Sequence, residues 1–146
     1  MQYVAFLSKE GRNTLIDFPD APGCQTFAAR GDHLLEVATD ALEGWLEAHL
    51  VRGRDDLPPV PRKHRASRGR ATLMVTVRPT LAAKVALRRA RLQRQLSQAQ
   101  LGARLGVSQQ AVAKLEDPDQ NTTIESLRKA AEALNADVSI RIELRT

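Results

Sequence analysis

The chain has 146 residues, of which 42% are apolar and 27% charged, so it can bury the core of one ordinary domain or of two small ones and is not a disordered chain. Its net charge of +5 is unevenly spread: residues 1–53 carry 4 basic and 8 acidic side chains, residues 54–71 carry 6 and 2, and residues 72–146 carry 12 and 7. An acidic front and a basic rear indicate two different partners, with nucleic acid favoured for the basic part.

Neither a membrane span nor a metal site is expected. No apolar run approaches the roughly 18 residues that a membrane helix needs, and the first residues lack the pattern of a signal peptide, so we expect a cytoplasmic protein. The single cysteine, Cys24, excludes an internal disulfide framework. The three histidines (His33, His49 and His64) match no zinc spacing. We therefore expect no metal and no cofactor.

The first 53 residues predict a small antiparallel sheet covered by one long helix. Residues 3–7 and 14–18 are β-forming runs separated by a turn-rich segment, which is typical of a hairpin, and residues 24–29 suggest a third strand. Helical periodicity then follows to residue 50, with Asp32 as the expected N-cap. The inward stripe of this helix is expected to be Leu34, Leu35, Ala38, Ala41, Leu42, Trp45, Leu46 and Leu50.

A basic, proline-containing segment divides the chain. Residues 54–71 have no apolar period and are interpreted as a linker. Residues 72–77 form a further strand-like run that could return to the front sheet. We take residues 1–53 and 72–146 as two domains, the second containing this strand and a set of helices.

Residues 97–116 are typical of a helix-turn-helix. Ser97 and Gln100 form a capping box that starts the first helix. Gly106 stands where that helix must stop and the chain must turn, and Ser108 caps the second helix. Small residues at positions 102 and 103 let the two helices approach closely.

The outward face of the second helix suits duplex DNA. Gln109 and Gln110 lie near its N-terminus, where glutamine can donate to and accept from adenine in the major groove. Neighbouring polar and basic residues would hold phosphates. The residues expected to face DNA are Arg94, Gln98, Arg104, Ser108, Gln109, Gln110 and Lys114. The alternative is a three-helix core with a solvated polar face.

Single-stranded nucleic acid is a poorer candidate ligand. Proteins that bind it gain affinity by stacking bases on aromatic rings, and no Phe, Tyr or Trp follows Trp45. Double-stranded DNA is the better target.

The last segment predicts a helix and a strand. Thr122 and Glu125 form a second expected capping box, and Asn135 ends the helix that follows. Residues 137–146 then alternate polar and apolar side chains as a half-buried strand does. The expected dimerisation residues are Val138, Ile140, Ile142 and Leu144. This strand could pair with residues 72–77 of its own chain, or with its equivalent in a second copy to give a two-fold dimer that suits a palindromic operator.

Residues 16–50, IDFPDAPGCQTFAARGDHLLEVATDALEGWLEAHL, are similar to the HicB-type antitoxins: an FPD-x-PGC-x-T turn precedes a long helix that opens with Gly-Asp. Residues 87–134 resemble the helix-turn-helix family of phage repressors and bacterial antitoxins. With residues 77–91, the resemblance spans nearly the whole chain. Gly102 departs from it, standing where alanine is usual, at a cost of about 1 kcal/mol of helix stability.

The resemblance implies an α+β fold, with a front domain of partial ribonuclease H-like fold and an all-α helix-turn-helix domain that ends in a short dimerising strand. It further implies that the front domain masks a HicA-type ribonuclease toxin that cleaves mRNA, and that the rear domain represses the shared operon. The implied partners are this toxin, double-stranded operator DNA and a second copy of the chain, in a homodimer or a pair of such dimers.

An acidic front suits a basic RNA-binding toxin. The expected toxin-binding residues are Asp17, Phe18, Asp20, Asp40, Glu43 and Glu47. The alternatives are that these charges are solvated and that Pro19, Pro22 and Gly23 only shape the corner of the chain.

Catalysis is not expected. Nuclease chemistry on a ribonuclease H-like outline needs several carboxylates converging on metal ions, and the acidic residues here show no such convergence in sequence. Cys24 has no histidine beside it and is interpreted as a packed thiol. The alternative function is a stand-alone helix-turn-helix regulator whose front domain senses a ligand, although the front half offers no glycine-rich phosphate loop.

Overall fold

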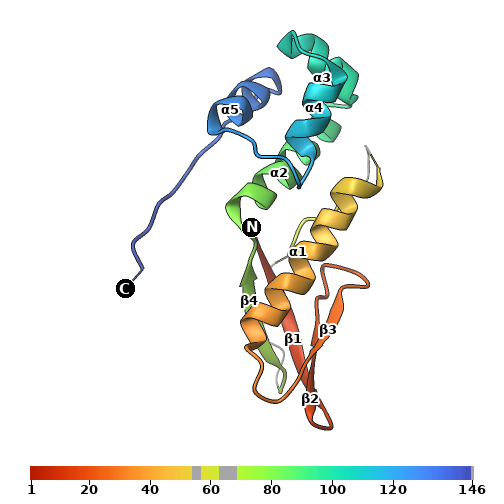
Figure 1. The fold of residues 1–146 in the computed structure, drawn as a ribbon, viewed down its shortest axis with the longest axis vertical. Coiled ribbons are helices and arrows are strands. Elements are labelled where there is room, and N and C mark those ends of the chain that lie inside the picture. The colour runs from red at the N-terminus through yellow and green to blue at the C-terminus, as the bar shows by residue number, and fades with distance from the viewer. Residues whose placement is uncertain (54–56, 63–68, 146) are drawn as a thin grey trace.

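The computed structural model describes residues 1–53, 57–62 and 69–145, and its fold is α+β (Figure 1). The described residues form a four-stranded antiparallel sheet and five helices. In chain order these are β1 (Gln2–Glu10), β2 (Asn13–Asp17), β3 (Gln25–Ala28), α1 (Leu34–Arg52), β4 (Ala71–Thr76), α2 (Pro79–Gln93), α3 (Gln98–Leu105), α4 (Gln109–Glu116) and α5 (Ile124–Ala133).

The sheet has the strand order β3-β2-β1-β4. β1 and β2 form the predicted hairpin, whose turn contains Gly11 at a φ of 62°. β3 pairs with β2, and β4 pairs with β1 in a register that sets Val4 opposite Met74. The expectation that residues 72–77 return to the front sheet is therefore confirmed, and the sheet takes strands from both sides of the basic segment 54–71.

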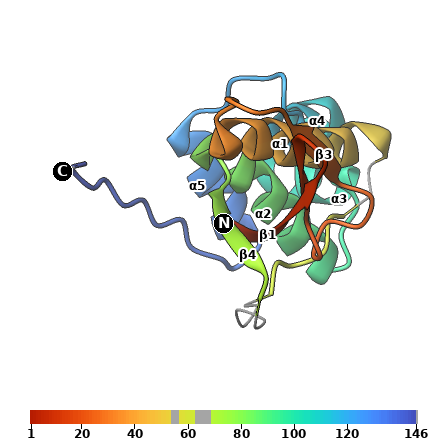
Figure 2. The ribbon, with the colours of Figure 1, turned by 90° about the horizontal axis from the view of Figure 1, so that it is seen from below.

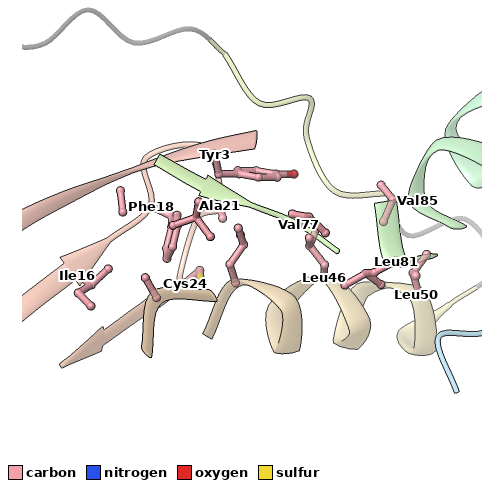
Figure 3. Packing of buried hydrophobic residues seen from close by; sticks show 14 of the residues in the cluster. Tyr3, Ile16, Phe18, Ala21, Cys24, Leu46, Leu50, Val77, Leu81 and Val85 are labelled. Carbon is pink, nitrogen blue, oxygen red and sulfur yellow. The ribbon is translucent and has the colours of Figure 1, made fainter. Parts of the chain in front are cut away.

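Helix α1 covers one face of this sheet, and the front core lies between them (Figure 3). Ala38, Leu42, Leu46 and Leu50 are buried on α1, as the periodicity predicts. Leu35 was expected on the same stripe but is exposed, because it lies in the first turn of α1.

The expected N-cap of α1 is wrong. The helix begins after His33, which caps it with no side-chain hydrogen bond. Asp32 instead accepts a hydrogen bond from the backbone amide of Ala29 at 2.8 Å, so its carboxylate stabilises the turn before the helix.

Helix α2 belongs to two cores at once. Leu81 and Val85, in its first half, pack with Leu50 and Val77 in the front core. Further along, Leu87 packs in a second core with Leu101, Val112, Ala130 and Leu134 from α3, α4, α5 and the residue that caps α5. One continuous helix therefore fastens the helical domain to the sheet domain.

The predicted turn chemistry of the helix-turn-helix is confirmed. Ser97 and Gln100 make both bonds of the capping box, and the Oγ of Ser108 accepts from the amide of Ala111. Gly106 has a φ of 69°, a left-handed conformation that favours glycine. Asn135, at a φ of 53°, follows the end of α5 as predicted.

The predicted capping box of Thr122 and Glu125 is not formed, and the N-cap of α5 lies one residue later. Thr123, not Thr122, caps α5, and its Oγ1 accepts from the amide of Ser126 at 3.1 Å. The hydroxyl of Thr122 is taken by a different partner, because it accepts a hydrogen bond from the ammonium of Lys84 at 2.7 Å.

The C-terminal residues do not form the expected strand within this chain. Residues 136–145 have no strand assignment, and they leave the body of the molecule as an extended arm (Figures 1 and 2). β4 pairs with β1 along one edge, and no described residue of the arm pairs with its other edge. The arm is therefore not paired within the described part of the chain, and pairing between copies is treated below.

Gly102 and Gly44, both in helices, allow a matched test of how closely α3 approaches the backbone of the turn that follows it. A Cβ added at Gly102 would lie 2.8 Å from the backbone oxygen of Val107, whereas one added at Gly44 would meet nothing within 4 Å. We predict that Gly102→Ala lowers the free energy of unfolding by about 1–3 kcal/mol through overpacking. Gly44→Ala should raise it by about 0.5–1 kcal/mol. Urea denaturation of both variants measures this, and equal stabilisation by the two substitutions would contradict the close approach.

Candidate functional site

The first turn of α4 presents the residues predicted to read DNA. Gln110 and Lys114 are exposed and Gln109 is half-buried, while Val112 on the opposite side packs in the helical core. Ser108 is exposed and its hydroxyl caps the helix, so its side chain orients the turn that carries the two glutamines. The positive end of the α4 dipole lies at this turn and favours an anion such as a phosphate there.

The predicted phosphate contacts Arg94 and Arg104 meet at the end of α5. The Nε of Arg94 donates to the carbonyl of Leu134 at 2.9 Å, and its Nη2 donates to Asn135 at 3.3 Å. Arg104 donates to the carbonyl of Ala133 at 3.4 Å. Both side chains therefore satisfy carbonyls at a helix C-terminus, where a cation is electrostatically favoured.

Gln98 does not lie on the outward face. Its side chain is only 5% exposed, and its Nε2 donates to Glu116 Oε2 at 3.2 Å. The prediction that it contacts phosphate fails because the first turn of α3 points this amide into the core. Its role in the structure is to help hold a buried carboxylate.

Glu116, the last residue of α4, is the centre of a buried polar cluster. Arg91 donates to both of its carboxylate oxygens, from Nε to Oε1 at 2.6 Å and from Nη2 to Oε2 at 3.1 Å. Arg88 donates from Nε to Oε2 at 2.9 Å. All three side chains are almost fully buried, so these are charge-assisted hydrogen bonds in a site of low dielectric constant.

Arg88 also reaches the end of α1. Its Nη1 donates to the carbonyls of His49 at 3.2 Å and Gly53 at 2.8 Å, and its Nη2 donates to Leu50 at 2.8 Å. These carbonyls are the negative end of the α1 dipole, which adds to the attraction that Glu116 exerts on the guanidinium. One side chain thus joins the C-terminus of α1 to the C-terminus of α4.

Lys84 completes the attachment of α4 to α2. It is buried, and it donates to the carbonyl of Leu115 at 3.3 Å as well as to Thr122. Burial lowers the pKa of Lys84 below its usual value. No role was predicted from the sequence for the basic residues in this part of α2. The missed signal is that Lys84, Arg88 and Arg91 recur every three or four residues on the stripe that begins with Leu81 and Val85.

On the front domain, the predicted toxin-binding residues divide into buried, paired and exposed groups. Phe18 is 1% exposed and packs in the front core, so the prediction that it contacts a partner is wrong in this structure. Asp17 accepts from Gln25 Nε2 at 3.0 Å, and Asp20 accepts from the amide of Arg62 at 2.7 Å. Asp40 is exposed on α1.

Glu43 and Glu47, on α1, are joined to the start of α2. Arg78 donates from its amide to Glu43 Oε1 at 2.7 Å and from Nη1 to Glu43 Oε2 at 2.5 Å, and its Nη2 is hydrogen-bonded to Glu47. Bonds to Glu47 and Glu43 raise the pKa of Arg78 above its usual value. The acidity of this part of α1 is therefore partly neutralised within the chain.

The FPD-x-PGC turn is fastened to α1. Trp45 Nε1 donates to the carbonyl of Pro22 at 3.3 Å, and Cys24 Sγ lies 3.6 Å from the carbonyl of Ala41. Burial raises the pKa of Cys24 to about 11, so at neutral pH it is a protonated thiol and a poor nucleophile. These contacts favour the interpretation that the turn shapes the corner of the chain.

Within the described residues there is neither a cluster of metal ligands nor a membrane-spanning helix. No three His, Cys, Asp or Glu side chains gather there in a way that could hold a metal ion. None of the helices in the same residues is long and apolar enough to cross a bilayer.

The chain is similar to known proteins in both of its parts. Residues 87–140, which contain α3, α4 and α5, match the helix-turn-helix family. Over 131 residues the chain is 29% identical to a protein named Antitoxin HicB 1 from Photorhabdus laumondii subsp. laumondii, and this match covers 88% of the chain and 77% of that protein. A solved chain from a HicA3 and HicB3 toxin-antitoxin complex aligns over 54% of this chain and 100% of its own length, with 24% identity and a TM-score of 0.46.

The Glu116 cluster makes a testable stability prediction. Glu116→Gln keeps the shape of the side chain but leaves two buried guanidinium groups without this carboxylate. We expect it to lower the free energy of unfolding by about 3 kcal/mol or more, because breaking a buried ion pair leaves a charge uncompensated. Glu132→Gln, which removes an exposed partner of Arg128, is the control and should change little. Equal urea midpoints for the two variants would refute a structural role of the cluster.

Proposed function

We propose that this chain, which fits a HicB-type antitoxin with a C-terminal helix-turn-helix, binds and neutralises a small mRNA-cleaving ribonuclease of the HicA type and represses its own operon. The observation that carries the proposal is the match to Antitoxin HicB 1 over 88% of the chain, which extends across both the sheet domain and the helical domain. The helix-turn-helix match supports the DNA-binding half. The division into a toxin-binding domain (1–53), a basic linker (54–71) and a DNA-binding part (72–146) belongs to this proposal, except that β4 (Ala71–Thr76) completes the sheet of the toxin-binding domain.

In the DNA-binding half, α4 enters the major groove with its first turn. Gln109 and Gln110 read base edges there, because a glutamine amide can pair with the donor and acceptor of adenine. Lys114 binds a phosphate, and Arg94 and Arg104 add positive charge beside the end of α5. Lys84, Arg88 and Arg91 act behind them, by holding α4 in its orientation.

The operator is bound by a dimer. Two copies related by a two-fold axis would present two α4 helices to the half-sites of a palindrome. We assign the interface to the C-terminal arm, since Val138, Ile140, Ile142 and Leu144 are all exposed there. A pair of such dimers on adjacent operators is compatible with this arrangement.

In the toxin-binding half, the front domain, a partial ribonuclease H-like fold, covers the toxin without chemistry of its own. Its exposed acidic residues attract a basic RNA-binding protein and raise the association rate. Asp40 contributes most directly, as it lies exposed on α1, whereas Glu43 and Glu47 are shared with Arg78. Neutralisation by masking requires no catalytic residue, so we infer that the chain is not an enzyme.

The DNA-reading residues are tested by separating specificity from affinity. We expect replacement of Gln109 and Gln110 by alanine to reduce the ratio of operator to nonspecific affinity by about tenfold or more. Lys114→Ala should weaken both affinities alike and reduce the salt slope of binding by about one unit. Fluorescence anisotropy with operator and scrambled duplexes measures both effects. Unchanged discrimination in the glutamine variant would exclude base reading by α4.

The role of α1 is tested with a small basic ribonuclease of the HicA type, the partner that we propose. We expect Asp40→Lys to slow its association with this chain several-fold at low ionic strength, and the difference to shrink as salt is added. Glu125→Lys, an exposed acidic residue of α5, is the matched control and should leave the rate unchanged. Stopped-flow association of the two proteins gives the rates. Identical behaviour of the two variants would place the toxin away from α1.

A further inference from the structure

The C-terminal arm has two chemically different sides. Successive side chains of an extended backbone point in opposite directions, so even-numbered and odd-numbered residues lie on opposite sides. The even side carries Val138, Ile140, Ile142 and Leu144, which are 40%, 58%, 91% and 95% exposed. The odd side carries Ser139, Arg141, Glu143 and Arg145. Arg141 and Glu143 are neighbours on that side, with Nη1 and Oε1 3.4 Å apart.

The apolar side of the arm begins at a groove on the helical domain. Residues of α2 and α5 line this groove, which has a volume of about 280 Å³. Ala83, Ala86, Ala90 and Ala131 form much of its wall, and their small side chains leave the space unfilled. Val138 reaches the groove, but the arm then leaves the body, so Ile142 and Leu144 have no such surface beneath them (Figures 1 and 2).

We propose that the arms of two copies pair as antiparallel strands centred on Ile142, so that Ile142 lies opposite Ile142 of the second copy. The proposal rests on the arm-mediated dimer of the proposed function and adds the register of pairing. A two-fold axis perpendicular to the arms makes the strands antiparallel and the interface self-complementary. In this register Ile140 faces Leu144 of the second copy, and the apolar side chains all lie on one face of the ribbon.

Charge complementarity favours this register over those centred one residue to either side. Centring on Ile142 sets Arg141 opposite Glu143 of the second copy, and symmetry makes this pair twice. Moving the centre to Arg141 would place two arginines opposite each other, and moving it to Glu143 would place two glutamates opposite each other. Like charges directly opposite in an antiparallel pair are destabilising. A centre between two residues would set polar against apolar side chains on the same face.

The ribbon also supplies an occupant for the groove. Its apolar face is continuous with Val138, which already contacts the groove in each copy. In this register Leu144 of the second copy lies opposite Ile140 of the first, so it is the apolar side chain of the second copy that comes nearest the alanine-lined wall, and the reverse holds by symmetry. A second copy of this chain is the partner for which the groove is shaped.

Charge reversal tests the register in the full chain. Arg141→Glu sets glutamates opposite glutamates, and Glu143→Arg sets arginines opposite arginines, so each variant alone should raise the dimer dissociation constant by about tenfold or more. A mixture of the two variants should form a heterodimer, because each Glu then faces an Arg. The double variant Arg141→Glu with Glu143→Arg should dimerise like the natural chain. Sedimentation velocity and native mass spectrometry give the species present.

Crosslinking provides a second measurement of the same register. Ile142→Cys should form an intermolecular disulfide on mild oxidation, since opposite Cβ atoms in an antiparallel pair approach to about 4.5–5.5 Å. Ser139→Cys, on the polar side and outside the Arg141–Glu143 pairs, is the matched control and should crosslink much less. Cys24 is buried, so it should contribute little background crosslinking.

The outcomes separate the register from the interface. If Glu143→Arg dimerises normally while Ile142→Glu gives monomers, the register is wrong and the arm interface stands. If removal of residues 137–146 leaves the dimer intact, the interface lies elsewhere, and both this inference and the proposed dimer fall. The register is supported if Arg141→Glu and Glu143→Arg each dimerise weakly alone and form a stable dimer when mixed.

Discussion

The buried guanidinium of Arg88 is the contact on which the arrangement of the two domains depends. It is bonded to the carboxylate of Glu116, at the end of α4, and to three carbonyls at the end of α1. An arginine suits this position because its planar donors can satisfy several acceptors at once, whereas a lysine offers a single compact charge. Arg88 therefore holds α4, the helix that reads DNA in our proposal, and also caps the C-terminus of α1.

The acidic front and basic rear seen in the sequence are partly neutralised by ion pairs within the folded chain. Part of the acidic front is neutralised by Arg78, and part of the basic rear is buried around Glu116. Portions of the basic segment also lie against the front domain, where the backbone amide of Arg62 donates to Asp20 and the guanidinium of Arg70 lies over the ring of Phe6. The net charge of a segment therefore overstates the charge that it offers to a partner.

Local sequence patterns predicted most of the fold. The wrong predictions concern residues whose position is determined by contacts with distant parts of the chain. The hairpin, the Ser97 capping box and the Gly106 turn depend on neighbouring residues, and each is found where the sequence indicates. Gln98 was placed on the wrong side because its environment is set by Glu116, far along the chain. The sequence pattern of the arm is that of a strand, but strand pairing needs a partner, and the described chain has none in place for it.

We propose that one chain masks a ribonuclease with its front domain while its helical domain binds the operator. The most direct test is to titrate the full chain against a HicA-type ribonuclease, with cleavage of an mRNA as the readout. Cleavage should stop at an equimolar ratio, and Asp40→Lys should require a higher concentration than the natural chain at low salt. Cleavage that persists with the chain in large excess would contradict this proposal.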